Sequence, residues 1–197
     1  MTWKEIKVAA FQKMGSSENG SVDFNADENR DALAAMPQAC NEALQYVCDT
    51  AKPYRKHVTV TVTAGARTML ISDIVQDYAH MGAMEVYRMT DGVPEETECT
   101  IMADKYISFY SDGTFEWWYD AKPEPVTDNT ADSYEFPYDP DVCVILPLYI
   151  ASEVNKNDDD EGLCTTYRNE FEVAVDALRK RIAGQQTGAF YSLTGWC

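Results

Sequence analysis

Residues 163–182, LCTTYRNEFEVAVDALRKRI, carry the most regular pattern in the chain. Their apolar side chains recur at spacings of four, four, three, four and four, at Leu163, Tyr167, Phe171, Ala174, Leu178 and Ile182. This spacing places them on one face of an amphipathic helix, which other elements must cover. Acidic residues precede the stretch and basic residues follow it, as the helix dipole favours, and Gly184 predicts the end of the helix.

Three more helices are expected elsewhere in the chain. A capping box at Thr2–Glu5 predicts a helix that ends at Gly15, and a second apolar stripe predicts a helix over about Asn29–Ala51. Another helix is expected after Asp139, with Pro140 in its first turn. Because no pair of these helices can cover its own apolar stripes, we expect the pair in residues 1–53 to pack with the pair in residues 139–184 as a four-helix scaffold.

Between the two helical pairs, residues 54–138 show the two-residue period of strands. Val58, Val60 and Val62 alternate with threonines, and Asp91-Gly92 indicates a turn. Two aromatic runs flank Ser111-Asp112-Gly113 and predict a hairpin over residues 105–119. We therefore expect an α+β fold in which the scaffold carries an inserted, antiparallel β-sandwich-like unit of about five or six strands.

The charge of the chain excludes some partners. It carries 33 acidic and 16 basic residues among 197, for a net charge of −17. Such a chain repels phosphate, which argues against a reader of nucleic-acid sequence and against binding to an anionic membrane. No signal peptide and no membrane span is expected, so the six cysteines are predicted to be free thiols.

No sequence pattern indicates catalysis or metal binding. His57, His80 and the cysteines lack zinc-site spacing, and the acidic run at residues 157–161 fits a helix cap better than a calcium loop. We expect neither an enzyme nor a cofactor. Around Trp117 and Tyr119, the aromatic run either fills the β core or, if these rings share the outer face, forms a sugar-binding platform.

Residues 185–197 form a C-terminal tail with four large apolar side chains. Exposure of such side chains to water is unfavourable, so the tail either folds back onto its own domain or docks into another subunit. The candidate partner-binding residues are Phe190, Tyr191, Leu193 and Trp196.

Two stretches of the C-terminal helical pair resemble the head–tail connector (adaptor) proteins of tailed bacteriophages. They are LPLYIASE at residues 146–153 and YRNEFE at residues 167–172. The opening helix, with TWKEIK and AFQKM, and CNEAL at residues 40–44 are similar to the same family. The resemblance covers helical parts of the chain and leaves the β insertion unexplained.

This resemblance implies a homo-oligomeric ring, usually twelve-fold, that binds the portal protein and the neck or tail proteins and lines a DNA passage. It implies a place in the virion, at the head–tail junction, after synthesis in the bacterial cytoplasm, with the C-terminal tail reaching into the portal. A negative lining lets DNA slide without sticking. Two alternatives remain open: another neck, tail-completion or decoration protein, and a carbohydrate-binding β module.

Overall fold

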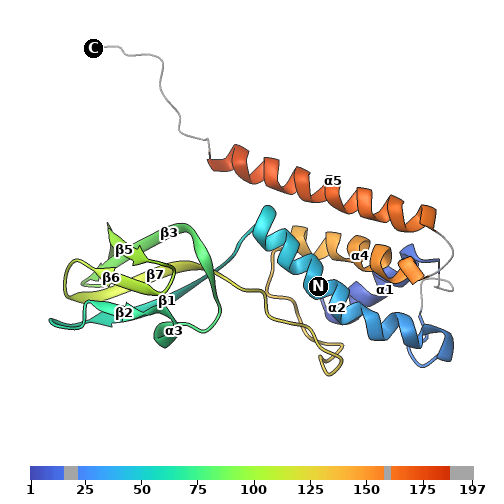
Figure 1. Cartoon of the computed structure of the whole chain (residues 1–197), viewed down its shortest axis with the longest axis horizontal. Coiled ribbons are helices and arrows are strands. Elements are labelled where there is room, and N and C mark those ends of the chain that lie inside the picture. The colour runs from blue at the N-terminus through green and yellow to red at the C-terminus, as the bar shows by residue number, and fades with distance from the viewer. Residues whose placement is uncertain (16–21, 158–160, 187–197) are drawn as a thin grey trace, which may run out of the picture. The chain divides into compact units, whose positions relative to one another are not determined.

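The computed structural model of the chain describes residues 1–15, 22–157 and 161–186. It is a mixed α/β protein with antiparallel sheets (Figure 1). The helices are α1 (Trp3–Lys13), α2 (Arg30–Thr50), α3 (Ile71–Ile74), α4 (Pro140–Val154) and α5 (Glu161–Gln186), with short 3₁₀ turns at Asp27–Asn29 and Asn155–Asn157. The strands are β1 (Tyr54–Val62), β2 (Thr68–Leu70), β3 (Tyr78–Thr90), β4 (Val93–Thr97), β5 (Cys99–Met102), β6 (Tyr106–Phe109) and β7 (Gly113–Ala121).

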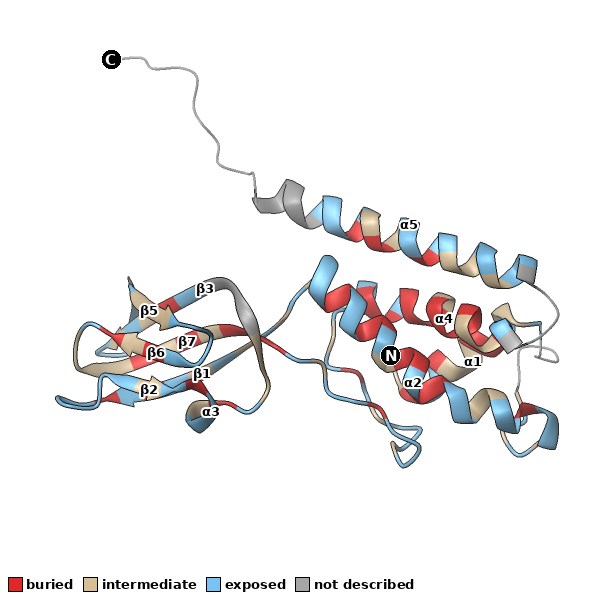
Figure 2. Cartoon of the chain, in the orientation of Figure 1, coloured by how far each residue is buried: buried red, intermediate tan, exposed pale blue. Residues whose placement is uncertain are grey.

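The chain divides into two compact units, each with its own hydrophobic core. Met1–Lys52 and the chain from Glu124 onward form a helical unit, and Pro53–Pro123 form a β unit. The N-terminal and C-terminal helices thus share one core although the whole β unit separates them in sequence. Figure 2 shows the buried residues of α2 and α4 gathered on the sides that face other helices.

Local sequence explains where α1 begins. The Thr2 hydroxyl accepts a hydrogen bond from the Glu5 backbone N–H (3.2 Å), and the Thr2 N–H donates to the Glu5 carboxylate (2.8 Å), which confirms the predicted capping box. Trp3, Ile6 and Ala10 are buried, as the stripe predicts. The first helix therefore presents its apolar face to the core of the helical unit.

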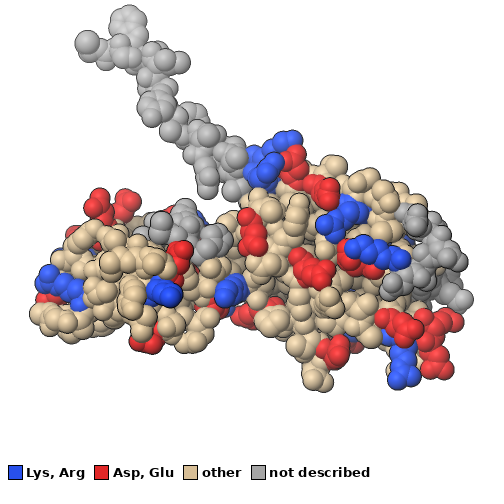
Figure 3. All heavy atoms as spheres, viewed as in Figure 1, with Lys and Arg blue, Asp and Glu red and all other residues tan. Residues whose placement is uncertain are grey.

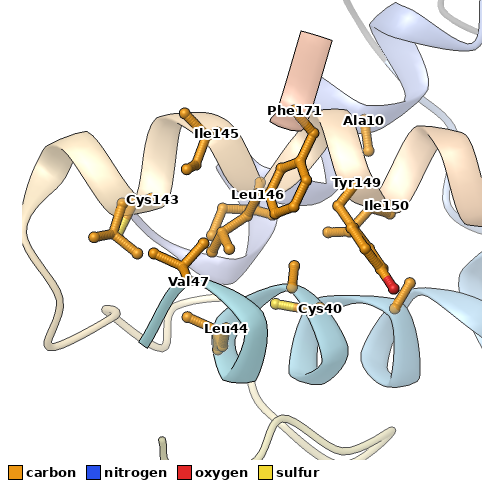
Figure 4. Close-up of a cluster of buried hydrophobic side chains, with 14 of the residues drawn as sticks. Ala10, Cys40, Leu44, Val47, Cys143, Ile145, Leu146, Tyr149, Ile150 and Phe171 are labelled. Carbon is orange, nitrogen blue, oxygen red and sulfur yellow. The ribbon is translucent and has the colours of Figure 1, made fainter. Parts of the chain in front are cut away.

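The central layer of the helical unit is α4, which packs against α1, α2 and α5. Leu44 and Val47 of α2, Leu146 and Ile150 of α4 and Phe171 of α5 are each fully buried in one cluster (Figure 4). The predicted apolar stripes of α2 and α5 thus supply core residues. One boundary differs: α5 continues through Gly184 to Gln186, so the helix ends two residues beyond the glycine expected to stop it.

The expected C-terminal boundary of the β unit, residue 138, is wrong, because the segment after Pro123 packs on the helices. Val126 exchanges two hydrogen bonds with the Asn41 side chain on α2 (2.7 and 2.8 Å) and is buried. The Trp3 N–H donates to the Tyr134 carbonyl (2.9 Å), and the buried Phe136 ring lies 6.0 Å from the Trp3 ring. Residues 124–138 therefore cover α1 and α2 as part of the helical unit.

Two antiparallel sheets build the β unit. One has the strand order β1-β7-β3-β4 and the other β2-β6-β5, so seven strands replace the five or six expected. Their core contains Val60, Ile107, Phe109, Phe115 and Trp117. The alternation from Val58 to Val62 is confirmed, with Val60 and Val62 buried on the inner face of β1.

The predicted hairpin over residues 105–119 is wrong. β6 pairs with β2 and β5, whereas β7 pairs with β1 and β3, so the two aromatic runs belong to different sheets. The Phe109 and Phe115 rings pack 4.7 Å apart in the core between them. Ser111-Asp112-Gly113 is therefore a crossing from one sheet to the other, with Gly113 at a φ of +145° that few other residues adopt.

The turn at Asp91-Gly92 is confirmed. It joins β3 and β4, which pair antiparallel from Thr90 and Val93 outward. Both turn residues have positive φ, +52° at Asp91 and +81° at Gly92, as a two-residue hairpin turn that follows the strand twist requires.

Candidate interaction site

The YRNEFE stretch of α5 lies where the last helix meets the rest of the helical unit. The Tyr167 hydroxyl donates a hydrogen bond to the backbone carbonyl of Lys13, at the end of α1. One turn later, Phe171 is fully buried, with its ring 5.0 Å from Tyr149 of α4 and 5.7 Å from Tyr46 of α2. Figure 4 shows Phe171 directed from α5 toward Leu146 and Tyr149. These contacts bind α5 to three other helices.

Arg168 adds a polar contact beside Phe171. Its guanidinium lies 3.2 Å from the Glu153 carboxylate on α4 and 3.2 Å from Glu172 on α5, and it stacks 4.5 Å from the centre of the Tyr149 ring. The Tyr149 hydroxyl donates to Glu42 of α2 (3.2 Å), and burial raises the pKa of this hydroxyl although Arg168 favours its ionised form. A continuous set of polar contacts thus links α2, α4 and α5. We refer to Tyr149, Glu153, Tyr167, Arg168 and Phe171 as the α5 clasp.

Other side chains of the same stretch face away from the core. Asn169 and Glu170 are exposed, and Val173, one turn further, is 70% exposed. The stretch therefore has two sides: a clasp side that builds the fold, and an outer side that a partner can reach. Nothing in this arrangement resembles paired catalytic groups, since every titratable member of the clasp is engaged in a contact between or along helices.

Directly beyond α5 lies the tail with the four candidate partner-binding residues. Phe190, Tyr191, Leu193 and Trp196 lie outside the residues that the structure describes. What the structure does place is the helix that leads to them. Near its end, Arg181 forms an ion pair with Asp141 in the first turn of α4, so α4 and α5 run antiparallel and α5 is held close to its last turn.

The aromatic platform considered for sugar binding is wrong. Trp117 and Tyr119 lie on the inner face of β7, where they are 0% and 6% exposed, and their ring centres are 5.1 Å apart in the β core. Alternation along β7 places Trp118 on the other face, stacked on His57 of β1 at 4.7 Å. Because the two rings that the carbohydrate hypothesis needed are buried, we do not retain that hypothesis.

Tyr119 instead contributes a pH-dependent contact to the β unit. Its hydroxyl donates to Asp77 (2.8 Å), which also binds Lys56 (2.8 Å), and burial together with this bond raises the pKa of Tyr119 to about 12 from its ordinary 10. Since the folded-state pKa is the higher one, the stabilisation is complete below about pH 10 and is lost as the pH rises toward 12.

We therefore expect the urea midpoint of the β unit to fall between pH 10 and pH 12, and to fall less in Tyr119→Phe. Circular dichroism of the full chain at a series of pH values measures this. An equal fall in both proteins would show that Tyr119 does not carry the effect.

Among the residues that the structure describes, no group of three or more His, Cys, Asp or Glu is placed to hold a metal. His57 is used in the ring contact with Trp118, while His80 belongs to β3, whose backbone pairs with β7 at Asp120. Most of the acidic run at residues 157–161 lies outside the described residues. None of the five described cysteines is in a disulfide, as predicted; they are Cys40, Cys48, Cys99, Cys143 and Cys164.

No sequence pattern predicted a cleft that the structure shows in the helical unit. It has a volume of about 340 Å³ and lies between α1, α2 and the segment 124–138, and we call it the α1–α2 cleft. Trp3, Phe24, Leu33 and Pro37 supply its apolar lining. Lys7 lies within it, its ammonium 4.6 Å from the centre of the Phe24 ring and 2.5 Å from Asp132. Only the non-local segment 124–138 completes this wall, so no local sequence pattern signals it.

Comparison with protein-family models and with curated proteins found no match to this chain. None of the helices in residues 1–15, 22–157 and 161–186 combines the length and the hydropathy that a membrane span needs. The interpretation of the site therefore depends on the geometry of the α5 clasp, the tail and the α1–α2 cleft.

Proposed function

We propose that this chain is a non-enzymatic structural subunit of a head–tail connector ring in a tailed bacteriophage. In this proposal α1, α2, α4 and α5 act as a four-helix scaffold, and the β-sandwich-like insert is a separate unit. The ring would bridge the portal protein to the neck or tail, inside the virion, and line the passage for DNA.

One observation carries this assignment. The YRNEFE stretch, in which the chain resembles adaptor proteins, forms most of the α5 clasp and fixes the helix that leads into the tail. A helix held at both ends presents the following segment at a defined place on each subunit. Repetition of such a contact around an axis builds a closed ring from heterologous interfaces.

The charge distribution supports a conduit. On the face drawn in Figure 3, acidic side chains gather at the end of the helical unit where α2 begins, and Asp23, Asp27, Glu28 and Asp31 are exposed there. With a net charge of −17, a ring of such subunits repels phosphates at short range and lets DNA pass without binding it.

A second candidate is another structural component of the particle, such as a neck, tail-completion or decoration protein. This second hypothesis fits the same helical unit and the same net charge. Only the position of the chain in the particle distinguishes the two hypotheses.

Native mass spectrometry of the full chain, alone and with the portal protein of the same phage, tests the proposal. We expect a monomer that becomes a closed ring of a single stoichiometry when the portal is present. A chain that stays monomeric with the portal, or that forms open chains of many sizes, would contradict a connector ring.

A further inference from the structure

The α1–α2 cleft has the size and lining of a side-chain pocket. At about 340 Å³ it lies at the small end of ligand pockets, which span roughly 300–1,000 Å³, so it suits one or two side chains and not a folded surface. Phe24 and Leu33, which are half-buried, offer a ring and an aliphatic side chain to a partner, whereas Trp3 and Pro37 line the cleft as buried residues. Aromatic rings of a partner would gain both buried apolar area and ring contacts there.

The charge around the cleft restricts what can enter. Lys7 is neutralised by Asp132 at 2.5 Å, and Asp128 lies on the same wall. Just before and within the first turn of α2, Asp27, Glu28 and Asp31 are exposed acidic residues and Arg30 is an exposed basic one. An acidic partner is therefore repelled, and a second copy of this chain is strongly acidic over most of its length.

Residues 187–197 have the sequence TGAFYSLTGWC. They contain no charged side chain but three aromatic rings, at Phe190, Tyr191 and Trp196. The acidic surroundings of the cleft do not repel an uncharged aromatic segment. We propose that the α1–α2 cleft binds Phe190 and Tyr191 of a neighbouring copy of the chain.

Chain length indicates why the occupant comes from a neighbour. Ion pairs of Asp141 with Arg181 and of Asp139 with Lys52 place the ends of α5 and α2 at the same end of the helical unit. The cleft lies at the other end of α2, where Pro37 is thirteen residues before Thr50, or about 20 Å along the helix. Phe190 and Tyr191 can extend at most about 14 and about 18 Å beyond Gln186, so these two rings fall short of the cleft in their own chain.

This contact deepens the proposed ring and rests on it. Each subunit would give its tail to one neighbour and accept the tail of the other, which is a head-to-tail contact that closes by repetition. A peptide in a cleft supplies such a contact with little folded mass.

Photo-crosslinking in the full chain tests this assignment. Phe190 is replaced by p-benzoylphenylalanine, the protein is mixed with ¹⁵N-labelled chain, and crosslinked peptides are sequenced by mass spectrometry. We expect crosslinks between labelled and unlabelled chains that map to residues 3–7, 24–37 or 127–132. Crosslinks within one chain only, crosslinks only to the portal, or no crosslinks at all would overturn the proposal.

A matched pair of variants separates the cleft from the surface around it. Ala34 and Ala35 are both exposed on α2, and only Ala34 lines the cleft. Ala34→Arg should lower the yield of cleft crosslinks by about tenfold or more, whereas Ala35→Arg should leave it unchanged. Equal yields in the two variants would contradict binding in the cleft. A closed ring that still forms with Ala34→Arg would leave the connector proposal standing and remove the cleft contact from it.

Discussion

Replacing Phe171 by alanine is expected to lower the free energy of unfolding of the helical unit by about 3–5 kcal/mol, the range for truncating a fully buried phenylalanine. The ring is the largest buried side chain that α5 contributes among its described residues, with Val175 and Leu178 as the others. Its loss opens a cavity against Tyr149 and Tyr46. We therefore expect α5 to detach before the rest of the chain unfolds.

Hydrogen exchange measured by mass spectrometry resolves this, because it reports each unit of the chain separately. Peptides from α4 and α5 should lose protection in Phe171→Ala, while peptides from the β unit keep theirs. Val173→Ala on the same helix is the control, since that side chain is 70% exposed and its removal should change stability by less than about 0.5 kcal/mol. Equal protection of α5 in the two variants would show that Phe171 does not hold the helix.

Removing two aromatic side chains of the tail is expected to abolish assembly without unfolding the subunit. Among the described residues, Leu178 is the last in the sequence that belongs to the core of the helical unit, so we expect Phe190→Ser with Trp196→Ser to leave that core intact. If each ring contributes about 2 kcal/mol or more to docking, the two substitutions together weaken docking roughly a thousandfold.

Sedimentation velocity of the full-length double variant, alone and with the portal protein, measures this loss as the fraction of chain in assemblies. Ser192→Ala with Thr194→Ala is the matched control, because it changes the same segment and keeps its apolar side chains. We expect the control to assemble like the unaltered protein. If the double serine variant assembles at the same protein concentration as the unaltered chain, the tail does not have the partner-binding role.

Helical periodicity predicted most of the helical unit, because each amphipathic stripe is a local pattern that reports one buried face. Ile6 and Ala10 of α1, Leu44 of α2 and Phe171 of α5 lie in the core as their spacing indicates. The end of α5 was less predictable. Gly184 is only mildly unfavourable inside a helix, so the helix continues past it to Gln186.

The β unit shows where local signals are insufficient. The Asp112-Gly113 signal and the flanking aromatic runs are those of a hairpin. However, β6 and β7 pair with other strands, and their Phe109 and Phe115 rings pack against each other in the core. Strand pairing is decided by burial of both sheet faces across the whole unit, and no dipeptide encodes it. A turn whose strands do pair, Asp91-Gly92, was predicted because its positive φ values are a local requirement.

The candidate site was predicted only in part. The resemblance in YRNEFE pointed to residues that the structure places in the α5 clasp, although it did not distinguish Phe171, which is buried, from Asn169, which is exposed. The α1–α2 cleft was missed because its wall depends on residues 124–138, which bind α2 through Asn41 and Val126, 85 positions apart. Contacts between residues so far apart in the chain produce no periodic pattern in a single sequence.

Electron cryo-microscopy of the particle neck, with the position of this subunit resolved, tests the central claim most directly. The proposal predicts a closed ring of these chains beneath the portal, with the helical unit of each subunit contacting its neighbours around the DNA passage. Density for the chain outside the neck, or particles whose neck lacks it, would contradict a head–tail connector.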